Sequence, residues 1–367
     1  MRVLHIYKAY YPESVGGIER SIKNIIDGTN KLGSTSRILT TYKKTKNKKT
    51  ISFKQNFEIF STPFSYNLFL NFKKITKSFD ILHYHHPWPF MDFLHILLNI
   101  KTPSILTYHS DVVRQKNLKL IYKPLMNLFF SKISRIVCSS QNYLKTSSDL
   151  KKFKTKTSVI PFGINIKDYK INNIKLKLYK KNFGSDFIIF VGALRYYKGL
   201  EYLLKAVSKT NYKLLIVGKG KMFKSVNTYI KKNNINNVTI LRNIKDTELS
   251  CLIKLSKCLV LPSHLRSEAF GFALLEGLMF RKPLVSCNIG TGTSFINIDK
   301  KTGFVVKPKS SRSIRLALNK IYNKNFNEKK FQKNCKIRFE KYFTQDKMVS
   351  KYFDLYKSMI NTSNRTY

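Results

Sequence analysis

The chain lacks most of the features that mark a membrane-spanning, secreted or metal-stabilised protein. It has no run of about 18 apolar residues, which excludes an ordinary membrane-spanning helix. The five cysteines are odd in number, and none are paired as CxxC or spaced for zinc, so we expect reduced, structural thiols. The N-terminal run MRVLHIYKAYYP has neither the apolar stretch nor the cleavage site of a signal peptide. We therefore expect the protein to stay on the cytoplasmic side.

Acidic residues are also scarce. Against 20 Asp and Glu residues stand 68 Lys and Arg residues, which gives a net charge of +48 and a pI near 10.1. Such a surface attracts anionic membranes and nucleic acid over about a Debye length. Only 13 of the basic residues are Arg, however, and Lys lacks the bidentate fork that reads guanine or clamps phosphate. We therefore expect an anionic membrane surface as a partner, and no nucleic acid.

The densest basic patch is a run of lysines over residues 43–49. Its members are Lys43, Lys44, Lys46, Lys48 and Lys49. The run is either a solvated loop or a loop that faces the membrane.

At 367 residues the chain is too long for one ordinary core, which favours two domains. Strand-like apolar runs alternate with helix-like segments, and this alternation occurs twice, with a break near Pro161 to Asn182. The pattern predicts an α/β protein with two facing Rossmann-like, doubly wound domains at residues 1–170 and 183–342. Ligands of such sheets lie beyond the carboxyl ends of the strands, so facing domains create a cleft. Helical periodicity over Asp346 to Ile360 predicts a last helix that packs on either domain.

The segment SEAFGFALLE, residues 267–276, sets two carboxylates around a Phe-Gly pair. The run before it predicts a buried strand and Phe270 to Phe280 a buried helix, so Glu268 lies on the loop at the mouth of that helix. Glu276 would then lie about two turns inside it. Two acceptor-only carboxylates beside free helix amides suit a diphosphate flanked by a sugar and a ribose. The alternative is a capping glutamate and an unrelated helical one.

Two further loops carry groups that suit an anionic ligand. Gly16 and Gly17 precede a predicted helix, where they let the backbone approach an anion closely, although a plain turn is the alternative. The spacing is not the dinucleotide pattern GxGxxG. In FVGALRYYKGLEYL, Arg195 and Lys198 lie between a strand and a helix and should point into the cleft, unless this is a solvated basic loop.

Breaking a bond from a sugar to a diphosphate requires stabilisation of the departing negative charge. The chain contains no Asp-x-Asp pair, which argues against a divalent-metal clamp. We therefore expect no metal, and assign this work to Arg195, Lys198 and the helix termini.

Histidines follow or occupy two of the predicted strands. His109 comes just after the strand in SILTYHSD, with Asp111 nearby, and either faces the cleft or is structural. In HYHHPWP, alternation places His83 and His85 on one face and His86 on the other. Since no carboxylate lies at ligand spacing, we expect these three residues to line the acceptor side and to bind no metal.

Other glycine loops follow the strand in LLIVGKGKM and form the turn GTGTSF. They contain Gly218, Gly220 and Gly290. With the loops described above, five glycine-bearing loops follow strands in the two domains, which is hard to explain as unrelated turns.

Together these segments resemble the retaining nucleotide-sugar glycosyltransferases of family 4, which have the two-Rossmann-domain GT-B architecture. The resemblance covers nearly the whole chain and is carried by VGGIE, TYHSDVVRQK, IPFGIN, VGALRYYKGLEYLL, IVGKG, LPSHLRSEAFGFALLEGLMFRKPLVS and IGTGTSFIN. Three of these segments, HSDVVRQK, LRYYKGL and IGTGTSF, are similar to those of members that build bacterial surface polysaccharides, often mannosyltransferases. The resemblance also implies that residues 343–367 form a helix that crosses back to the first domain.

The resemblance implies a role for each matching residue. Glu268 would bind hydroxyls of the transferred sugar, and Gly271 and Phe272 would offer backbone contacts near it. Glu276 would hold the ribose, and Lys198 would clamp the diphosphate.

In the first domain, the resemblance implies that Gly16 and Gly17 close an amide loop over the diphosphate. His109 would contact the donor sugar near the reacting carbon. The anomeric configuration would be retained, through same-face attack in which the departing phosphate helps to deprotonate the acceptor, and without a metal or other cofactor.

Three positions depart from the family pattern. Ala193 stands where the family commonly has Arg, and Arg195 is a candidate for the lost cation. IPFGIN has Phe162 and Asn165 where Asn and Asp are usual, and Arg242 stands where a glycine often precedes the nucleobase site.

We therefore expect a peripheral membrane enzyme on the cytoplasmic side that moves a hexose, with mannose from GDP-mannose favoured, to a lipid-linked or growing saccharide. The alternatives are the same chemistry with a UDP-hexose, and a noncatalytic basic protein that binds membrane or nucleic acid. Such a protein would lack saturable nucleotide binding.

Overall fold

The computed structural model describes residues 1–11, 14, 16–41, 49–111 and 116–363. The chain forms two compact units: unit 1 contains Met1–Gly163 and Gln345–Tyr367, and unit 2 contains Ile164–Thr344. Of the predicted basic patch, Lys43, Lys44, Lys46 and Lys48 lie outside the described residues, as does the VVRQ part of HSDVVRQK.

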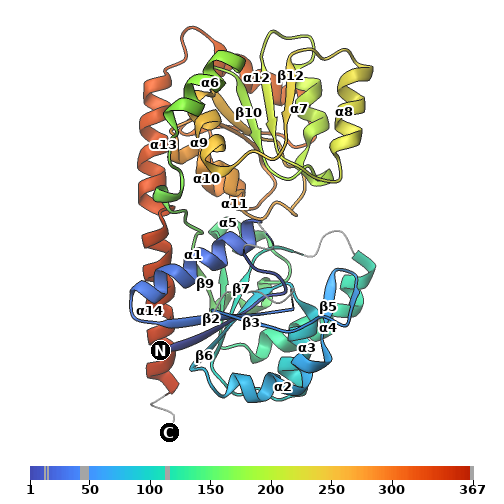
Figure 1. Cartoon of the computed structure of the whole chain (residues 1–367), viewed down its shortest axis with the longest axis vertical. Helices are drawn as coiled ribbons and strands as arrows, with labels where there is room; N and C mark the ends of the chain where they lie inside the picture. The colour runs from blue at the N-terminus through green and yellow to red at the C-terminus, as the bar shows by residue number, and fades with distance from the viewer. Residues whose placement is uncertain (12–13, 15, 42–48, 112–115, 364–367) are drawn as a thin grey trace. The chain divides into compact units, whose positions relative to one another are not determined.

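Unit 1 is built on a parallel sheet with the strand order β3-β2-β1-β6-β7-β8-β9. From β1 the chain runs to β2 and β3 on one side, and later to β6 and beyond on the other, so the strand order reverses between β1 and β6 (Figure 1). The strands are β1 (Arg2–Ile6), β2 (Thr35–Thr40), β3 (Thr50–Ser52), β6 (Ile81–His86), β7 (Ser104–Tyr108), β8 (Arg135–Cys138) and β9 (Thr157–Val159).

Helices cover both faces of this sheet, and a small hairpin lies beside them. The helices are α1 (Gly17–Lys31), α2 (Tyr66–Thr76), α3 (Pro89–Leu97), α4 (Lys116–Lys132), α5 (Gln141–Thr146) and α14 (Gln345–Ser363). The hairpin is β4 (Phe57–Ile59) and β5 (Thr62–Phe64). Because both faces are covered, β6 and β7 are buried throughout, as continuous apolar runs in parallel sheets usually are.

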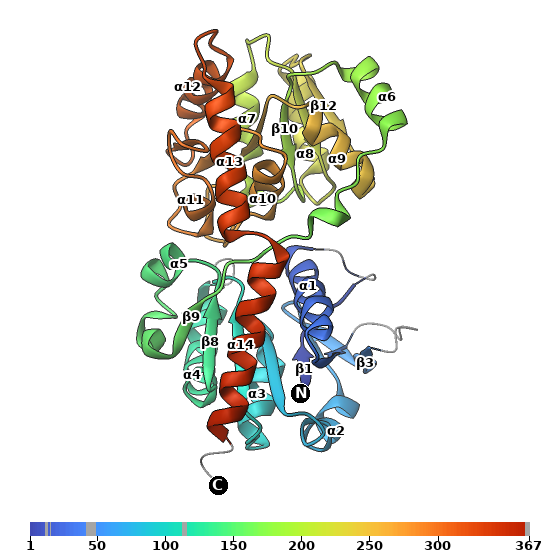
Figure 2. The same cartoon turned by 90° about the vertical axis from the view of Figure 1, so that its left-hand side faces the viewer.

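The C-terminal helix α14 belongs to unit 1. Its helical periodicity had not shown which of the two domains it packs on. It lies beside α1 (Figure 2), and a Cβ atom on Gly28 would lie only 2.2 Å from Val349 Cγ2. Met348, Tyr352 and Tyr356 are its buried face. The last helix therefore completes the core around β1 and β6.

Unit 2 has a second parallel sheet, with the strand order β12-β11-β10-β13-β14-β15. Its strand order reverses between β10 and β13, so the chain leaves these two neighbouring strands in opposite directions across the sheet. The strands are β10 (Ile188–Val191), β11 (Leu214–Val217), β12 (Val238–Leu241), β13 (Cys258–Leu261), β14 (Leu284–Cys287) and β15 (Gly303–Val306).

The helices of unit 2 flank this sheet and follow its strands in alternation. They are α6 (Asn173–Phe183), α7 (Leu200–Val207), α8 (Phe223–Lys232), α9 (Asp246–Leu255), α10 (Phe272–Met279), α11 (Gly292–Ile296), α12 (Ser311–Tyr322) and α13 (Glu328–Tyr342). Three short 3₁₀ segments complete the assignment of the described residues: η1 (Lys151–Lys156) precedes β9 in unit 1, and η2 (Ile166–Asp168) and η3 (Tyr196–Lys198) lie in unit 2. The parallel α/β prediction is confirmed.

The polar segment predicted as a joint between domains folds as helix α6. Asn172 caps it by accepting a hydrogen bond from the Lys175 amide at 3.0 Å, and Gly184 ends it with a positive φ. Helix α6 is therefore capped at both ends, although its amphipathic pattern is weak and none of its residues is buried. The chain passes between the units at Gly163 and Ile164, inside the predicted break of Pro161 to Asn182 and ahead of this helix.

The described helices are all too short or too polar to span a bilayer. All five cysteines are buried and free of disulfide bonds, in agreement with the prediction of structural thiols.

Unit 1 holds six of the seven histidines, and five of them are neutral because of burial. Burial lowers the pKa of His5 and of His109 to about 3, and that of His95 to about 4. It also lowers the pKa of His83 and His85 well below the ordinary value.

These pKa values predict that unit 1 is destabilised by mild acid before unit 2. The unfolded chain binds protons at histidine below pH 6.5 and the folded unit does not, so stability is complete above pH 6.5 and falls as the pH is lowered. Each such histidine contributes about 1.4 kcal/mol per pH unit in this window. Amide hydrogen exchange between pH 7 and 5 should show loss of protection in unit 1 first; equal loss in both units would contradict the prediction.

Candidate active site

In unit 2, the loops that leave β10 and β13 meet where the strand order reverses. This is the position at which doubly wound sheets bind their ligands. The loop after β10 carries Lys198, at the end of the single turn η3, and the loop after β13 carries Glu268. Lys198 Nζ donates to Glu268 Oε2 over 2.5 Å, and both residues are buried. The structure therefore joins two residues that lie 70 positions apart in the sequence.

A glycine allows these two loops to approach closely. Gly199 has a φ of +69°, and a Cβ atom there would lie 2.1 Å from the carbonyl oxygen of Pro262. Any other residue would be strained by its own backbone and would collide with the neighbouring loop. Gly199 therefore fixes the separation of Lys198 from the β13 loop.

Additional hydrogen bonds hold Glu268 in place. Ser263 Oγ donates to Glu268 Oε2 over 2.8 Å, and Thr291 Oγ1, from the loop after β14, donates to the Glu268 carbonyl over 2.8 Å. Since β13 and β14 are neighbours, three adjacent loops converge on this glutamate. A buried carboxylate that accepts hydrogen bonds from an ammonium and a hydroxyl is held in one orientation. The direction of its remaining lone pairs is then fixed.

Sequence reasoning missed Ser263 and Thr291. The one available signal was their position, because each hydroxyl follows a predicted strand by a few residues. That position alone does not distinguish a contact to Glu268 from an ordinary loop hydroxyl.

Gly271 and Phe272 lie at the start of helix α10, two residues after the start that the sequence predicted. Gly271 is the N-cap, with a φ of +96°, and Phe272 is the first helical residue. Glu268 lies on the loop before them, so its predicted place is confirmed. The first amides of a helix have no partner within the helix and carry its positive dipole, so this end suits an anionic group.

Glu276 lies about one turn inside α10 rather than two, because the helix begins at Phe272 and not at Phe270. The turn at 268–271 uses residues that their apolar character had assigned to the helix. Glu276 is buried, and its Oε1 accepts a hydrogen bond from the Tyr169 hydroxyl over 2.9 Å. Tyr169 lies in the segment just before α6. No local sequence pattern predicted its contact with Glu276.

Arg195 is exposed at the start of η3, and no ion pair of this guanidinium is found in the described part of the chain. It does not join the Lys198–Glu268 pair. Whether it supplies the cation that Ala193 lacks stays a prediction. Arg242, the other departure in unit 2, lies over the ring of Phe223 at 4.3 Å.

In unit 1, Gly16 and Gly17 start helix α1. Gly16 is the N-cap and Gly17 the first helical residue, with extended backbone at Gly16. The carboxylate of Glu19 folds back here: its Oε1 accepts from Ser14 Oγ over 2.7 Å, and its Oε2 lies 2.5 Å from where a Cβ of Gly16 would stand. A carboxylate already lies at this helix start, as the helix dipole favours.

His109 follows β7, at the carboxyl edge of the sheet in unit 1. Its ring stacks on Phe162 at 5.2 Å between centroids, and its Nε2 lies 3.0 Å from His85 Nδ1. Phe162, one of the departures from the family pattern, thus covers one face of His109. Asp111 contacts other groups, because its Oδ1 accepts from Tyr108 and from Ser147, each over 2.9 Å.

The prediction that His83, His85 and His86 line the acceptor side is wrong, because all three are at most 1% exposed. Alternation places His83 against Tyr356 of α14 and His86 against Tyr108, on opposite faces of β6. The helices on both sides of the sheet cover these strands completely, which a sequence pattern of polar residues does not reveal.

The ring nitrogens of His5, His83 and His85 lie within 4.8 Å of one another, which is close enough to consider a metal. Both nitrogens of His83, however, lie within hydrogen-bond distance of hydroxyls, at 2.6 Å from Tyr356 and 2.7 Å from Thr107. The lone pairs of His83 are therefore engaged with hydroxyls, and we interpret the three rings as part of a hydrogen-bonded core. The expected absence of a metal stays a prediction.

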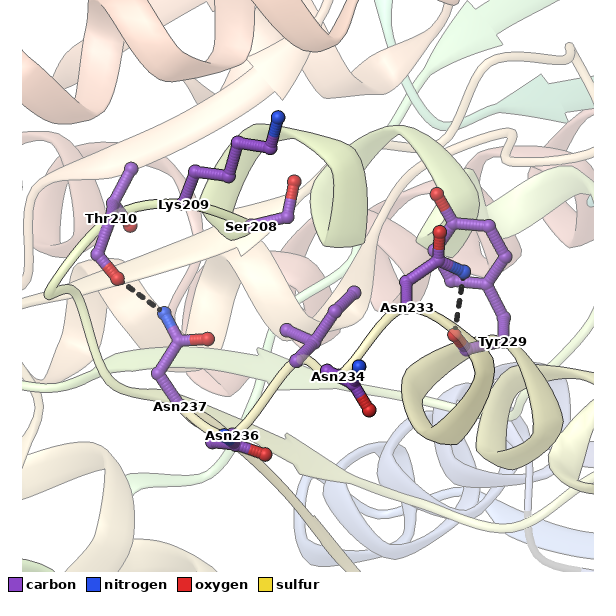
Figure 3. Close-up of a pocket in the computed structure, with 9 residues that line it drawn as sticks. Ser208, Lys209, Thr210, Tyr229, Asn233, Asn234, Asn236 and Asn237 are labelled. Atoms are coloured by element: carbon purple, nitrogen blue, oxygen red, sulfur yellow. Dashed lines mark hydrogen bonds between the residues drawn. The ribbon is translucent and has the colours of Figure 1, made fainter.

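A pocket of about 340 Å³ lies at the amino ends of β11 and β12, opposite to the edge that carries Lys198 (Figure 3). Its Asn237 side chain donates to the carbonyls of Val207, Thr210 and Tyr212 over 3.1, 2.9 and 2.7 Å. Because these bonds tie the sheet edge together, we regard Asn237 as structural, and place the chemistry at the carboxyl edge.

Comparison with known proteins gives two family matches that together cover most of the chain. Residues 173–338 match the model described as "Glycosyl transferases group 1", and residues 15–168 match "Glycosyltransferase Family 4".

Two curated relatives are similar over nearly their whole length. The O-antigen chain mannosyltransferase C of Escherichia coli is 40% identical over 99% of this chain and 100% of its own. The D-rhamnosyltransferase WbpZ of Pseudomonas aeruginosa is 38% identical over 94% of this chain and 92% of its own.

Solved structures agree on the fold. The sucrose-phosphate synthase of Thermosynechococcus elongatus has a TM-score of 0.81 at 16% identity, and covers 98% of this chain and 99% of its own. Anabaena Alr3699/HepE in complex with UDP-glucose has a TM-score of 0.79 at 16% identity, with 98% and 100% covered. With two Rossmann-like units, a Lys–Glu pair at a strand-order reversal and these relatives, the chain belongs to the family 4, group 1 glycosyltransferases of GT-B fold.

Proposed function

We propose that this glycosyltransferase retains anomeric configuration and moves a hexose, with mannose from GDP-mannose favoured, onto a lipid-linked or growing surface-polysaccharide acceptor. The observation that carries the site assignment is the buried Lys198–Glu268 pair where the strand order of unit 2 reverses. The sugar and acceptor are supported by the two relatives, which are named for O-antigen mannosyl transfer and for D-rhamnosyl transfer.

The donor sugar binds Glu268 in this proposal. A carboxylate offers only acceptors, so it suits the hydroxyl groups of a hexose. Its orientation is fixed by Ser263 and Lys198, and the α10 helix start at Gly271 and Phe272 lies directly after it. These amides would contact the sugar near Glu268.

The diphosphate binds Lys198, and the ribose binds Glu276. The ammonium and the nearby helix start stabilise the negative charge that develops as the sugar–phosphate bond breaks. Glu276, held by Tyr169 one turn inside α10, accepts hydrogen bonds from ribose hydroxyls. Arg195 adds a second cation on the same loop as Lys198. No metal or other cofactor has a part in this scheme.

The state of Glu268 bears on how the configuration would be retained, because a covalent intermediate on an enzyme carboxylate and same-face attack by the acceptor both give retention. A carboxylate that attacks the sugar carbon needs free lone pairs, whereas Glu268 is bound by an ammonium at 2.5 Å and a hydroxyl at 2.8 Å. That environment reduces its nucleophilicity. We therefore favour same-face attack by the acceptor, with its proton taken by the departing phosphate.

Unit 1 contributes Gly16, Gly17 and His109. The first two would place backbone amides against the diphosphate, which would displace the Glu19 carboxylate that now occupies the helix start. His109 would contact the donor sugar near the reacting carbon.

The acceptor side includes a membrane surface. Six large apolar side chains of the β4–β5 hairpin and α2 are exposed: Phe57, Ile59, Phe60, Tyr66, Phe69 and Leu70. The start of α2 is tied to the segment before the hairpin, because the Tyr66 amide donates to Asn56 Oδ1 over 2.9 Å. We call these six residues the α2 patch.

Lysines surround the α2 patch. Lys54, Lys73, Lys74 and Lys77 are exposed, and Glu58 is the one acidic residue in this stretch. Apolar side chains with a lysine rim suit an anionic lipid surface, where the chains enter the headgroup region and the ammonium groups stay with the phosphates. We propose that this surface holds the enzyme peripherally on the cytoplasmic face of a membrane.

A UDP-hexose donor is the second candidate, since solved structures of the same fold contain UDP and UDP-glucose. Membership of the family excludes the noncatalytic alternative that composition alone had left open.

Glu268→Gln is expected to lower the transfer rate by a factor of about 100 or more while the protein stays folded. The amide keeps the shape of the side chain but loses the charge. Glu268→Ala should in addition destabilise unit 2 by about 3 kcal/mol, because the Lys198 ammonium loses its partner. Transfer assays and thermal unfolding distinguish the two effects, with the exposed Glu340→Gln as a control. Turnover near that of the native protein in Glu268→Gln would refute the assignment.

Calorimetric titration in the presence of a chelator should show saturable binding of GDP, and weaker binding of UDP. Lys198→Met should raise the Kd for GDP about 10-fold to 100-fold and change that for GMP little, since a charge-assisted hydrogen bond to the second phosphate is lost. Arg195→Met tests whether this residue supplies the missing cation, and Lys205→Met on α7 is the control. Equal losses for GDP and GMP would place the diphosphate elsewhere, and preference for UDP would favour the second donor.

Sedimentation with vesicles containing phosphatidylglycerol should recover the native protein, whereas the double variant Phe60→Ser, Leu70→Ser should bind less. Removal of two exposed apolar side chains removes the part that enters the headgroup region. Ile174→Ser, on α6 of unit 2, is the matched control, since Ile174 is 80% exposed against 72% for Leu70. If both variants sediment like the native protein, the α2 patch is not the membrane surface.

A further inference from the structure

Three histidine rings of unit 1 form one hydrogen-bonded chain. His109 Nε2 lies 3.0 Å from His85 Nδ1, and His85 Nε2 lies 3.0 Å from His5 Nδ1. Neighbouring rings are stacked, with centroids 5.2 Å and 5.3 Å apart. All three residues are at most 5% exposed. We call His109, His85 and His5 the histidine chain.

Topology assembles this chain at the point where the strand order of unit 1 reverses. His5 is on β1 and His85 on the neighbouring strand β6, while His109 follows β7, the next strand. Their side chains lie on the face that α14 covers, as the contact of His83 with Tyr356 shows for that side of β6. Only His109 reaches the carboxyl edge of the sheet.

Each neutral imidazole carries one N–H, so the tautomers of the three rings are coupled. If His85 carries its proton on Nδ1, it donates to His109 Nε2, and the proton of His109 must be on Nδ1. His5 then donates from Nδ1 to His85 Nε2. In the other arrangement all three protons move to Nε2, and His109 Nδ1 becomes an acceptor. Burial keeps these rings neutral, in agreement with the lowered pKa values of all three.

The environment of His5, at the far end of the histidine chain, favours the arrangement in which all three protons are on Nδ1. His5 Nε2 is buried and has no hydrogen-bond partner in the described structure. A proton there would be an unpaired buried donor, and unpaired donors are rarer in protein interiors than unpaired acceptors. The proton of His5 is therefore favoured on Nδ1, which sets the direction of the whole chain.

We propose that His85 and His5 are positioning residues that hold His109 with its proton on Nδ1, so that His109 presents an N–H donor at the carboxyl edge of unit 1. Nδ1 of His109 has no hydrogen-bond partner among the described residues, and stacking on Phe162 fixes the plane of the ring. An oxygen acceptor of the donor sugar is the group that this N–H would bind. The ligand part rests on the proposed function; the tautomer part does not.

The tautomers are measured directly by nitrogen NMR of the full chain labelled with ¹⁵N-histidine at pH 7. The expected spectrum has His109, His85 and His5 all protonated on Nδ1. A proton on Nε2 of His109 would overturn the proposal, as would stoichiometric metal in the purified protein, since a metal would occupy the lone pairs that form the chain.

Two substitutions at the far end test the coupling. His5→Leu removes the donor to His85, so the His109 tautomer should become mixed and kcat should fall about 10-fold, the size of one hydrogen bond, with little change in KM. His5→Asn retains an N–H near the position of Nδ1. It should restore most of the Nδ1-protonated form of His109 and most of kcat. His95→Leu, which removes a buried histidine bonded to Tyr84 outside the chain, is the control for lost packing.

The outcomes separate the two levels of the proposal. If the His109 tautomer stays the same in His5→Leu, the histidine chain does not set it, and the inference fails. If the tautomer changes but kcat does not, the chain operates and the role of His109 in transfer fails instead. If His95→Leu lowers kcat as much as His5→Leu does and His5→Asn restores nothing, the effect is packing, and the positioning role is refuted.

Discussion

The buried ion pair between Lys198 and Glu268 is the interaction on which the site in unit 2 depends. Removal of each ion from water costs several kcal/mol, so such a pair persists only with close geometry and further hydrogen bonds. The 2.5 Å contact, the Ser263 hydroxyl and the close approach at Gly199 supply both. The same contacts hold a carboxylate and an ammonium rigidly at the strand-order reversal, where a doubly wound sheet binds its ligand.

The geometry of this pair also bears on the proposed binding of a sugar diphosphate. In the proposed function, a diphosphate that approaches Lys198 would compete with Glu268 for the ammonium, and sugar hydroxyl groups would take the acceptor positions that this frees. Each charged group would then exchange one partner for another, and none would be left unpaired during binding. Preorganised groups of this kind need little rearrangement when charge develops on the leaving group.

Unit 1 is organised around polar groups in an unusual place. Strands of a parallel sheet covered on both faces are normally apolar, yet β1 and β6 carry His5, His83 and His85 in the core. Buried polar groups require partners, and the hydroxyls of Thr107, Tyr352 and Tyr356 provide some of them. Two of these hydroxyls come from α14, so the last helix of the chain completes the core of the first unit.

Local patterns in the sequence determined the repeated α/β alternation and the loops that carry Lys198 and Glu268. They could do so because strand and helix periodicity, turn glycines and chain length act over a few residues. They gave the start of α10 as Phe270 rather than Phe272 and predicted no helix at α6, where the amphipathic pattern is weak. They also misplaced the histidines of β6, whose burial depends on α14 and on α3 and α4.

Only the tertiary structure decided which distant residues meet. The strand order joins Lys198 to Glu268 over 70 positions and brings the rings of the histidine chain together, with contacts over up to 80 positions. The packing of the segment before α6 against α10 joins Tyr169 to Glu276 over 107 positions. No local preference encodes such contacts, because they arise from the pairing of parallel strands and from the packing of elements that are distant in the sequence. The sequence therefore determined which chemical groups stand at strand ends, and the folded sheets determined which of them act together.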